Sequence, residues 1–268
     1  VRLVGIAIDI TARKEAEQEV RRLNVELEQR VRQRTAQLEE TNRELEAFAY
    51  SVSHDLRAPL RAIRGFSEVL LERHASQLDA EGRELLRHAC QGSEHMGRLI
   101  EDLLKLSRVG RSELHPQSVN LSALAESAAA ELQRAEPGRK VQFIIEPNLR
   151  ADGDERLLRI MLYNLLSNAW KFTGQRPDGR IEFGVTAPPE TAFFVRDDGV
   201  GFDMAHTGKL FRVFQRLHST SEFPGTGIGL ATVQRIVKRH HGRVWAVGAV
   251  NQGATFYFTL PNPGSFEP

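Results

Sequence analysis

The segment Asn164-Leu-Leu-Ser-Asn168-Ala-Trp-Lys171 lies in a predicted helix that runs from about Asp154 to Phe172. Asn164, Asn168 and Lys171 are spaced i, i+4 and i+7, so they lie along one stripe of that helix. Leucine and methionine residues form the adjoining apolar stripe, at positions 158, 161, 162 and 165. An asparagine inside a helix costs several tenths of a kcal/mol relative to alanine, so two in register indicate a binding role. The side-chain carbonyl oxygens of the asparagines can coordinate Mg²⁺, and Lys171 can bind a phosphate. The alternative is that both asparagines cap neighbouring loops.

Short strands surround this central helix in the sequence. Stretches of β-branched and aromatic residues predict strands at 119–121, 141–146, 180–187, 191–196, 243–250 and 254–260. Two more helices are expected, from about Ser122 to Arg134 and from about Ile228 to His241, and Asp152 or Asp154 is the expected N-cap of the central helix. Strands with helices between them predict an α+β sandwich with helices over one face of a sheet.

Two glycine-rich segments follow the central helix. In Asp197-Asp198-Gly199-Val200-Gly201, the glycines permit a tight turn and a close approach of the backbone to a ligand, and Asp197 offers an acceptor for an amino group. The alternative is an ordinary turn. Gly225-Thr226-Gly227-Ile228-Gly229-Leu230 opens the last helix, where free N–H groups and the positive helix end suit a phosphate. This segment lacks the Lys-Ser/Thr ending of a P-loop and follows no strand, so it is not a dinucleotide fingerprint either.

The N-terminal part of the chain has a different pattern. No Gly or Pro occurs from Arg13 to Phe48, and apolar residues keep a heptad spacing at 16, 20, 23 and 27, and again at 31, 38, 45 and 52. The step from Leu27 to Val31 is four where three is due, which predicts a parallel coiled coil with a stutter. The alternative is a single solvated helix, which would not need two heptad registers.

A second heptad run follows a turn expected near Ser76–Gly82. Its members step by four and three without a break, at 85, 89, 92, 96, 99, 103 and 106. Two such helices joined by a short turn form an antiparallel hairpin with apolar seams on more than one side. Two copies should therefore pair into a dimeric four-helix bundle, so we expect a homodimer.

His54 lies near the end of the first heptad run. With Val52 on the seam, His54 falls roughly 200° away around the helix, so we expect its ring to face a second domain. A neutral imidazole is a good nucleophile, and Asp55 could orient it or take its proton. Pro59 removes one backbone hydrogen bond, so a bend is expected there. The other histidines considered are expected on solvated faces: 74, 88, 95, 240 and 241.

The segment Ser53-His54-Asp55-Leu56-Arg57-Ala58-Pro59-Leu60 resembles the phospho-acceptor box of the histidine kinase family. The later segments resemble, in order, the family's ATP-binding boxes: the Asn box at 164–173, the first glycine box at 197–201, the Phe box at Phe211-Arg-Val-Phe214-Gln-Arg216, the second glycine box at 225–230, and the final G-x-T at Gly253-Ala-Thr255. Residues 1–12 resemble the exit of a PAS sensor domain.

This resemblance implies a Bergerat-type ATP site. Asn168, with Asn164, would hold Mg²⁺ against the triphosphate, and Asp197 would bind the adenine amino group. Thr255 would support Asp197 from beneath, and a small lid between Phe214 and Gly225 would order over nucleotide. Lys171 and Arg216 are candidates for phosphate contact, and the other nucleotide-binding residues implied are Gly199, Gly201, Gly225, Thr226, Gly227, Gly229 and Leu230.

The implied activity is that of a sensor histidine kinase. His54 would take the γ-phosphoryl group of ATP, with Asp55 as the proton acceptor, and pass it to the receiver domain of a response regulator. Ala58 stands where members with regulator phosphatase activity often carry Thr or Asn, so weak or absent phosphatase activity is expected. Two rival functions remain open: an ATP-binding module of the chaperone, topoisomerase and repair ATPase class, and a signalling scaffold without kinase activity.

Composition bounds these expectations. The formal charge of +1, from 36 basic and 35 acidic residues, argues against a dedicated nucleic-acid binder. Cys90 is the only cysteine, so we expect a reducing compartment. The resemblance to histidine kinases implies that this compartment is the bacterial cytoplasm. No apolar run reaches the roughly 18 residues of a membrane span, so no membrane contact is expected.

The chain begins without Met, so we expect it to be a fragment of a longer protein whose sensor domain lies on the same chain. The expected divisions are 1–12 (PAS end), 13–46 (coiled coil), 47–109 (phosphotransfer hairpin), 110–262 (ATP-binding domain) and 263–268 (tail).

Overall fold

The computed structural model describes residues 11–110, 113–187, 191–217 and 222–261. The chain divides into two compact units, residues 1–55 and 56–268, which are described separately below. The PAS-like strand expected within residues 1–8 and the tail at 263–268 lie outside the described residues. In the described part of the chain, no helix combines the length and the apolarity needed to cross a bilayer.

The first unit contains the beginning of one long helix. Helix α1 runs from Thr11 to Arg73 without interruption, and residues 11–55 of it belong to this unit. The apolar residues on both sides of the expected stutter are largely exposed on the isolated helix: Val20 57%, Leu23 49%, Leu27 59% and Val31 55%. Such an unburied stripe is what a partner helix would cover, and the coiled coil itself stays a prediction.

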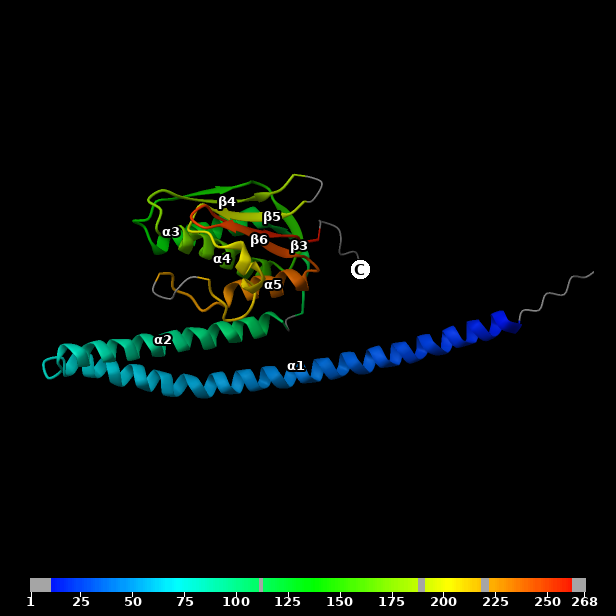
Figure 1. Ribbon diagram of the computed structural model, residues 1–268, viewed down its shortest axis with the longest axis horizontal. Coiled ribbons are helices and arrows are strands. Elements are labelled where there is room, and N and C mark those ends of the chain that lie inside the picture. The colour runs from blue at the N-terminus through cyan, green and yellow to red at the C-terminus, as the bar shows by residue number, and fades with distance from the viewer. Residues whose placement is uncertain (1–10, 111–112, 188–190, 218–221, 262–268) are drawn as a thin grey trace, which may run out of the picture. The chain divides into compact units, whose positions relative to one another are not determined.

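The second unit opens with a helical hairpin, as expected. The rest of α1 continues through Pro59 to Arg73, and α2 spans Ala80–Val109 (Figure 1). Asp79 caps α2 by accepting a hydrogen bond of 2.7 Å from the backbone N–H of Gly82. The turn is therefore shorter than the expected Ser76–Gly82, because its last residues already belong to the helix. Large apolar side chains stay exposed on both helices: Leu56 46%, Ile63 47%, Phe66 72%, Leu85 61% and Met96 45%.

Beyond the hairpin lies a five-stranded sheet. Its strand order is β2-β4-β5-β7-β6, with β2 and β4 parallel and all other neighbours antiparallel. The strands are β2 (Val141–Ile145), β4 (Gly179–Val185), β5 (Phe193–Asp197), β6 (Val244–Ala249) and β7 (Gly253–Phe258). A separate two-stranded sheet pairs β1 (Gln117–Asn120) with β3 (Arg150–Gly153). Strand β3 is short and polar, and no strand was predicted there.

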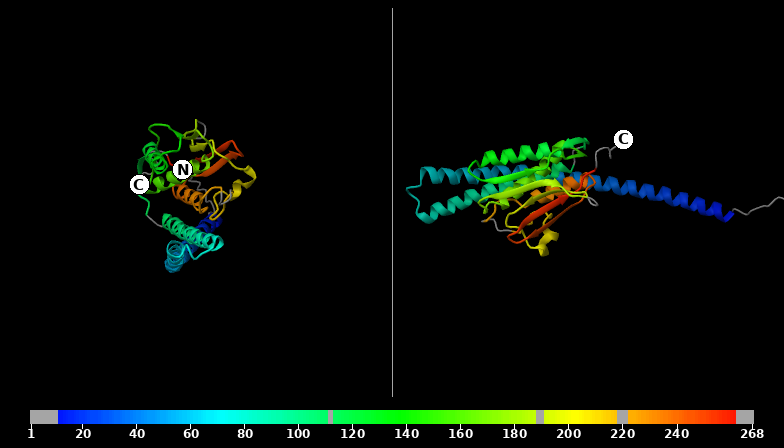
Figure 2. Two further views of the ribbon diagram at one scale, coloured as in Figure 1. Left: turned by 90° about the vertical axis from the view of Figure 1, so that its left-hand side faces the viewer. Right: turned by 90° about the horizontal axis from the view of Figure 1, so that it is seen from above.

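Three helices cover one face of the five-stranded sheet (Figures 1 and 2). They are α3 (Leu121–Ala135), α4 (Glu155–Phe172) and α5 (Gly229–Arg239), and a 3-10 helix, η1 (Met204–Lys209), follows β5. The predicted α+β sandwich with helices over one sheet face is thus confirmed. The strand expected at 119–121 ends one residue early, because the Asn120 side chain caps α3.

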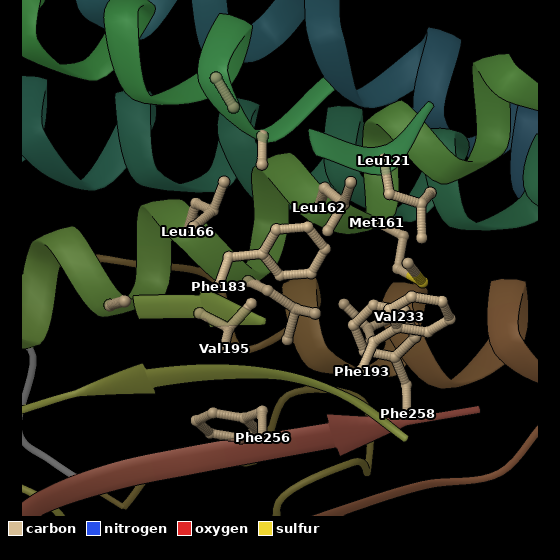
Figure 3. Packing of buried hydrophobic residues seen from close by; sticks show 14 of the residues in the cluster. Leu121, Met161, Leu162, Leu166, Phe183, Phe193, Val195, Val233, Phe256 and Phe258 are labelled. Carbon is tan, nitrogen blue, oxygen red and sulfur yellow. The ribbon is translucent and has the colours of Figure 1, made fainter. Parts of the chain in front are cut away.

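The core lies between α4 and the sheet. Leu158, Met161 and Leu162 of α4 are completely buried and face Phe183 and Phe258 of the strands, as Figure 3 shows for most of these residues. Burying each such side chain contributes about 1.5–3 kcal/mol. The apolar stripe predicted for the central helix therefore fixes α4 on the sheet and leaves the stripe of Asn164, Asn168 and Lys171 at the side.

The N-terminus of α4 contains an unexpected histidine contact. Asp154 is the N-cap and accepts a hydrogen bond of 3.1 Å from Leu157 N, so the alternative cap, Asp152, is excluded. The backbone N–H of Asp154 donates to Nε2 of His240 at 3.0 Å, and Nδ1 of His240 lies 2.8 Å from the carbonyl of Ile236. His240 is only 1% exposed. Its expected place on a solvated face is wrong, because it joins α5 to α4.

Candidate functional site

A cavity of about 310 Å³ lies beside the polar stripe of α4. The end of β5 and the glycine-rich segment before α5 form its other walls. It collects most of the predicted nucleotide-binding residues: Asn164, Asn168, Lys171, Asp197, Gly201, Arg216, Gly225, Thr226, Gly227, Gly229 and Leu230. Gly199 and Thr255 do not line it. Segments that are distant in sequence thus meet at one site.

The two asparagines bond within their own helix. Nδ2 of Asn164 donates to the Ile160 carbonyl at 2.7 Å, and Oδ1 of Asn168 accepts from Nζ of Lys171 at 3.4 Å. Neither bond caps a neighbouring loop, so the structure does not support that alternative. A Cβ added at Gly229 would lie 2.7 Å from Oδ1 of Asn164, so the start of α5 passes directly over this carbonyl oxygen. Two side-chain carbonyl oxygens are therefore present at the cavity wall.

Lys171 is a half-buried cation at the cavity wall. Its Nζ lies 4.2 Å from the centre of the Phe172 ring, at the bottom of the polar stripe. Burial and, to a smaller extent, the positive charge of Arg216 together lower the pKa of Lys171 to about 8. The positive charges of Lys171 and Arg216 repel each other in this cavity, and a bound anion would reduce the repulsion.

Asp197 is the buried acid. It ends β5 with 4% of its surface exposed, and its carboxylate accepts hydrogen bonds from the backbone N–H groups of Gly199, at 2.9 Å, and Ala254. Burial raises the pKa of Asp197 to about 7, although these two N–H donors act in the opposite direction. A carboxylate placed this way can accept a hydrogen bond from a ligand amino group in the cavity.

Glycine is required where the two loops bend. Gly201 has φ +61°, and a Cβ there would lie 1.9 Å from the carbonyl oxygen of Ala249. Gly227 has φ +74°, and its carbonyl accepts a hydrogen bond of 3.1 Å from Phe214 N. The second loop leads directly into α5, whose first turn supplies N–H groups without partners inside the helix. Such a helix start suits a phosphate.

Thr255 does not support Asp197. The strand register pairs Asp197 with Ala254 and Arg196 with Thr255. Because successive residues of a strand face opposite sides, Thr255 lies on the sheet face away from the cavity. Its Oγ1 accepts a hydrogen bond of 3.4 Å from Nε of Arg196. The expected role is therefore wrong, and the backbone N–H of Ala254 holds the carboxylate instead.

Gly199 also acts behind the cavity wall. Its N–H donates to Asp197, and a Cβ added there would lie 2.5 Å from the carbonyl oxygen of Phe172. This close approach packs the loop after β5 against the end of α4. Gly199 therefore fixes Asp197 and does not line the cavity.

The Phe box borders the cavity. Phe211 packs on the core, whereas Phe214 is 55% exposed, and Arg216 lines the cavity and donates to the carbonyl of Phe223. Phe223 in turn packs on Phe172, with ring centroids 5.1 Å apart. The expected lid includes residues 218–221, which lie outside the described residues, so its ordering stays a prediction.

Several cavity residues were not predicted from the sequence. Asp102 of α2 is the most notable, because its Oδ2 accepts a hydrogen bond of 2.8 Å from Oγ1 of Thr226. Lys209, at the end of η1, adds a third cation. Phe172, Phe202, Phe223 and Phe256 supply apolar walls. The aromatic residues next to the recognised motifs were a usable signal, whereas nothing local in the sequence marks Asp102.

His54 and Asp55 lie in the other unit. Both belong to α1, and Asp55 is exposed; the side chain of His54 is outside the described part of the chain. Their helical setting agrees with the sequence analysis, and their chemical roles stay predictions.

Two protein-family models match the sequence. Residues 44–112 match the His Kinase A (phospho-acceptor) domain, and residues 153–264 match the Histidine kinase-, DNA gyrase B-, and HSP90-like ATPase family. Cyanobacterial phytochrome A of Nostoc sp. is 36% identical over 224 residues, covering 82% of this chain and 29% of the relative. The methanogenesis regulatory histidine kinase FilI of Methanothrix harundinacea is 37% identical over 227 residues, covering 82% and 25%. The chain thus spans about a quarter to a third of these relatives.

A solved structure shares the fold. Full-length ShkA in complex with AMPPNP superimposes with a TM-score of 0.56 at 27% sequence identity, over 80% of this chain and 45% of that one.

Proposed function

The chain belongs to the sensor histidine kinase family, and from this premise we propose that it moves the γ-phosphoryl group of ATP to His54 and then to an aspartate of a response-regulator receiver domain. The observation that carries the proposal is the cavity beside α4. It joins a buried acceptor, Asp197, to a cationic end with Lys171 and Arg216, in a chain that also contains the His box.

The cavity fits ATP as the substrate. Its volume of about 310 Å³ falls at the lower end of the range of small-molecule sites. Asp197 would accept a hydrogen bond from the adenine amino group, beside Gly201 on the cavity wall. Lys171, Arg216 and the N–H groups at the start of α5 would bind the phosphates.

Mg²⁺ fits the same site. Asn164 and Asn168 present side-chain carbonyl oxygens, which are ligands of the kind that Mg²⁺ takes together with substrate phosphates and water. When bound there, the ion would neutralise phosphate charge during transfer. The residues of the chain would align the phosphates with the acceptor.

The proposed transfer is an in-line displacement. A ring nitrogen of His54 attacks the γ-phosphorus, a P–N bond forms, the bond to the β,γ-bridging oxygen breaks, and ADP leaves. Asp55 accepts the proton that the imidazole loses. The product is a phosphoramidate, from which the phosphoryl group can pass to the regulator's aspartate. Positioning and charge neutralisation supply most of the rate enhancement in such reactions.

The proposed setting is a cytoplasmic homodimer that receives its signal from a sensor domain in cis. The exposed apolar side chains of the hairpin, among them Phe66 and Leu85, support pairing with a second copy, because a water-exposed apolar seam of this kind is costly. The proposed divisions are a coiled coil up to residue 46, the phosphotransfer hairpin at 47–109 and the ATP-binding domain at 110–262.

Labelling with radioactive Mg-ATP tests this function. We expect an acid-labile, alkali-stable phosphoprotein in the wild type and no label in His54→Gln. Asp55→Asn should slow labelling by roughly 10²–10⁴-fold, the usual contribution of acid–base catalysis. His88→Gln, an exposed histidine on α2, is the matched control and should label normally. Full labelling of His54→Gln would refute the proposal.

A further inference from the structure

Asp102 connects the hairpin to the cavity. It lies on α2, and its Oδ2 accepts a hydrogen bond of 2.8 Å from Oγ1 of Thr226 in the second glycine box, called the glycine loop below. Nζ of Lys105 lies 3.3 Å from its other carboxylate oxygen. Asp102 is also one of the residues that line the cavity.

The end of α2 packs on α5 and so keeps Asp102 in place. Leu106 and Val109 of α2 are 7% and 3% exposed, and the guanidinium of Arg239 on α5 donates to the carbonyl of Val109. Figure 1 shows α2 running alongside α5 within this unit. The carboxylate is thus held by packing on one side and by Thr226 on the other.

This carboxylate stands where the proposed function needs phosphate. The glycine loop and the start of α5 favour an anion, and Lys171 and Arg216 add positive charge. Asp102 brings one negative charge to the same wall, and its partner Lys105 is largely in solvent, with 69% of its side chain exposed. A polyphosphate entering the site would meet this like charge, whereas a ligand without phosphates would not.

We propose that Asp102 sets the nucleotide specificity of the site by charge. While α2 packs on α5, the carboxylate of Asp102 accepts the hydrogen bond of the Thr226 hydroxyl group. ATP must therefore displace this carboxylate from the glycine loop, whereas adenosine need not. Asp102 therefore weakens the binding of triphosphates selectively and couples ATP binding to release of α2. This inference rests on the proposed nucleotide site and names a residue that controls access to it.

The test compares Asp102→Asn with a charge-matched control. Glu101→Gln removes the same charge from the adjacent, exposed position of α2, and Glu101 does not line the cavity. Calorimetric titration would give the dissociation constants of the Mg complex of AMPPNP and of adenosine for each protein. We expect Asp102→Asn to bind AMPPNP about tenfold more tightly, equivalent to about 1.4 kcal/mol, with adenosine unchanged within about twofold. Glu101→Gln should match the wild type for both ligands.

Other outcomes have distinct meanings. If Asp102→Asn and the control change AMPPNP binding equally, the effect is one of general surface charge and the inference is overturned. If AMPPNP and adenosine affinities shift by the same factor, Asp102 is only a structural tether, and the inference again fails. Asp102→Ala provides a second variant if the asparagine perturbs folding. Absence of binding of either ligand to the folded wild type would refute the proposed function itself, which is a separate result.

Discussion

Replacing Asp197 by asparagine should stabilise the ligand-free protein in a pH-dependent way. Burial raises the pKa of this carboxyl group from its ordinary value of 3.8 to about 7. One pKa unit corresponds to about 1.4 kcal/mol, so keeping the ionised group buried costs up to about 4 kcal/mol of folding free energy. Asparagine occupies the same volume and cannot ionise.

The sign follows from proton binding in the two states. Between pH 3.8 and about 7 the folded chain keeps a proton on Asp197 that the unfolded chain has released. Stability therefore falls as the pH rises through this window, and the full cost is present above it. Asparagine also alters the hydrogen bonds from Gly199 and Ala254, but that offset is the same at every pH.

Urea unfolding of the wild type and Asp197→Asn at pH 5 and pH 8, without nucleotide, would measure the effect. We expect the stability difference to shift in favour of the variant by about 3 kcal/mol between these two pH values, since most of the window lies there. Saturating Mg-AMPPNP should stabilise only the wild type, because the variant loses the proposed acceptor for the adenine amino group. A stability difference that stays constant from pH 5 to pH 8 would refute the reasoning.

Three further predictions concern other residues. Asn168→Ala should weaken AMPPNP binding by about tenfold or more in Mg²⁺ but little in EDTA, because it removes a proposed metal ligand; equal losses in calorimetry under both conditions would contradict the metal role. Ala58→Thr should accelerate the decay of phosphorylated regulator by supplying a polar group near His54, and an unchanged decay rate would show that position 58 is not limiting. His240→Leu should cost about 1–3 kcal/mol in urea unfolding, because it leaves the Asp154 N–H buried without its acceptor; a loss no larger than that of the exposed His88→Leu would disprove this.

Local periodicity accounts for what the sequence predicted well. The central helix carries its core stripe and its polar stripe in one segment, and Asp154 caps it where the first apolar residues begin. Both stripes therefore follow from 3.6 residues per turn, without knowledge of the sheet. The glycine segments were also predictable, because positive φ at Gly201 and Gly227 leaves few other choices.

The errors arise where tertiary register decides. Thr255 and Ala254 differ by one position, and only the pairing of β7 with β5 determines which faces Asp197. From the sequence, His240 lies at the end of an amphipathic helix and is expected to be exposed. Its burial depends on the hydrogen bond from the backbone N–H of Asp154, at the start of α4, which only the folded structure shows. Asp102 is 124 residues away from Thr226, and no local pattern could connect a helical-hairpin residue to a glycine loop.

The electrostatics of the cavity indicate what kind of ligand it evolved to hold. Asp197 is buried and Lys171 is half-buried, and burial shifts the pKa values of both groups toward neutrality. In the described part of the chain they do not pair with each other: Asp197 accepts from two backbone N–H groups, and Lys171 donates to Asn168. A fold selected only for stability would replace or pair such groups. A ligand with an N–H donor at one end and negative charge at the other would stabilise the charged forms of Asp197 and Lys171 together. An adenine nucleotide with a polyphosphate has this arrangement.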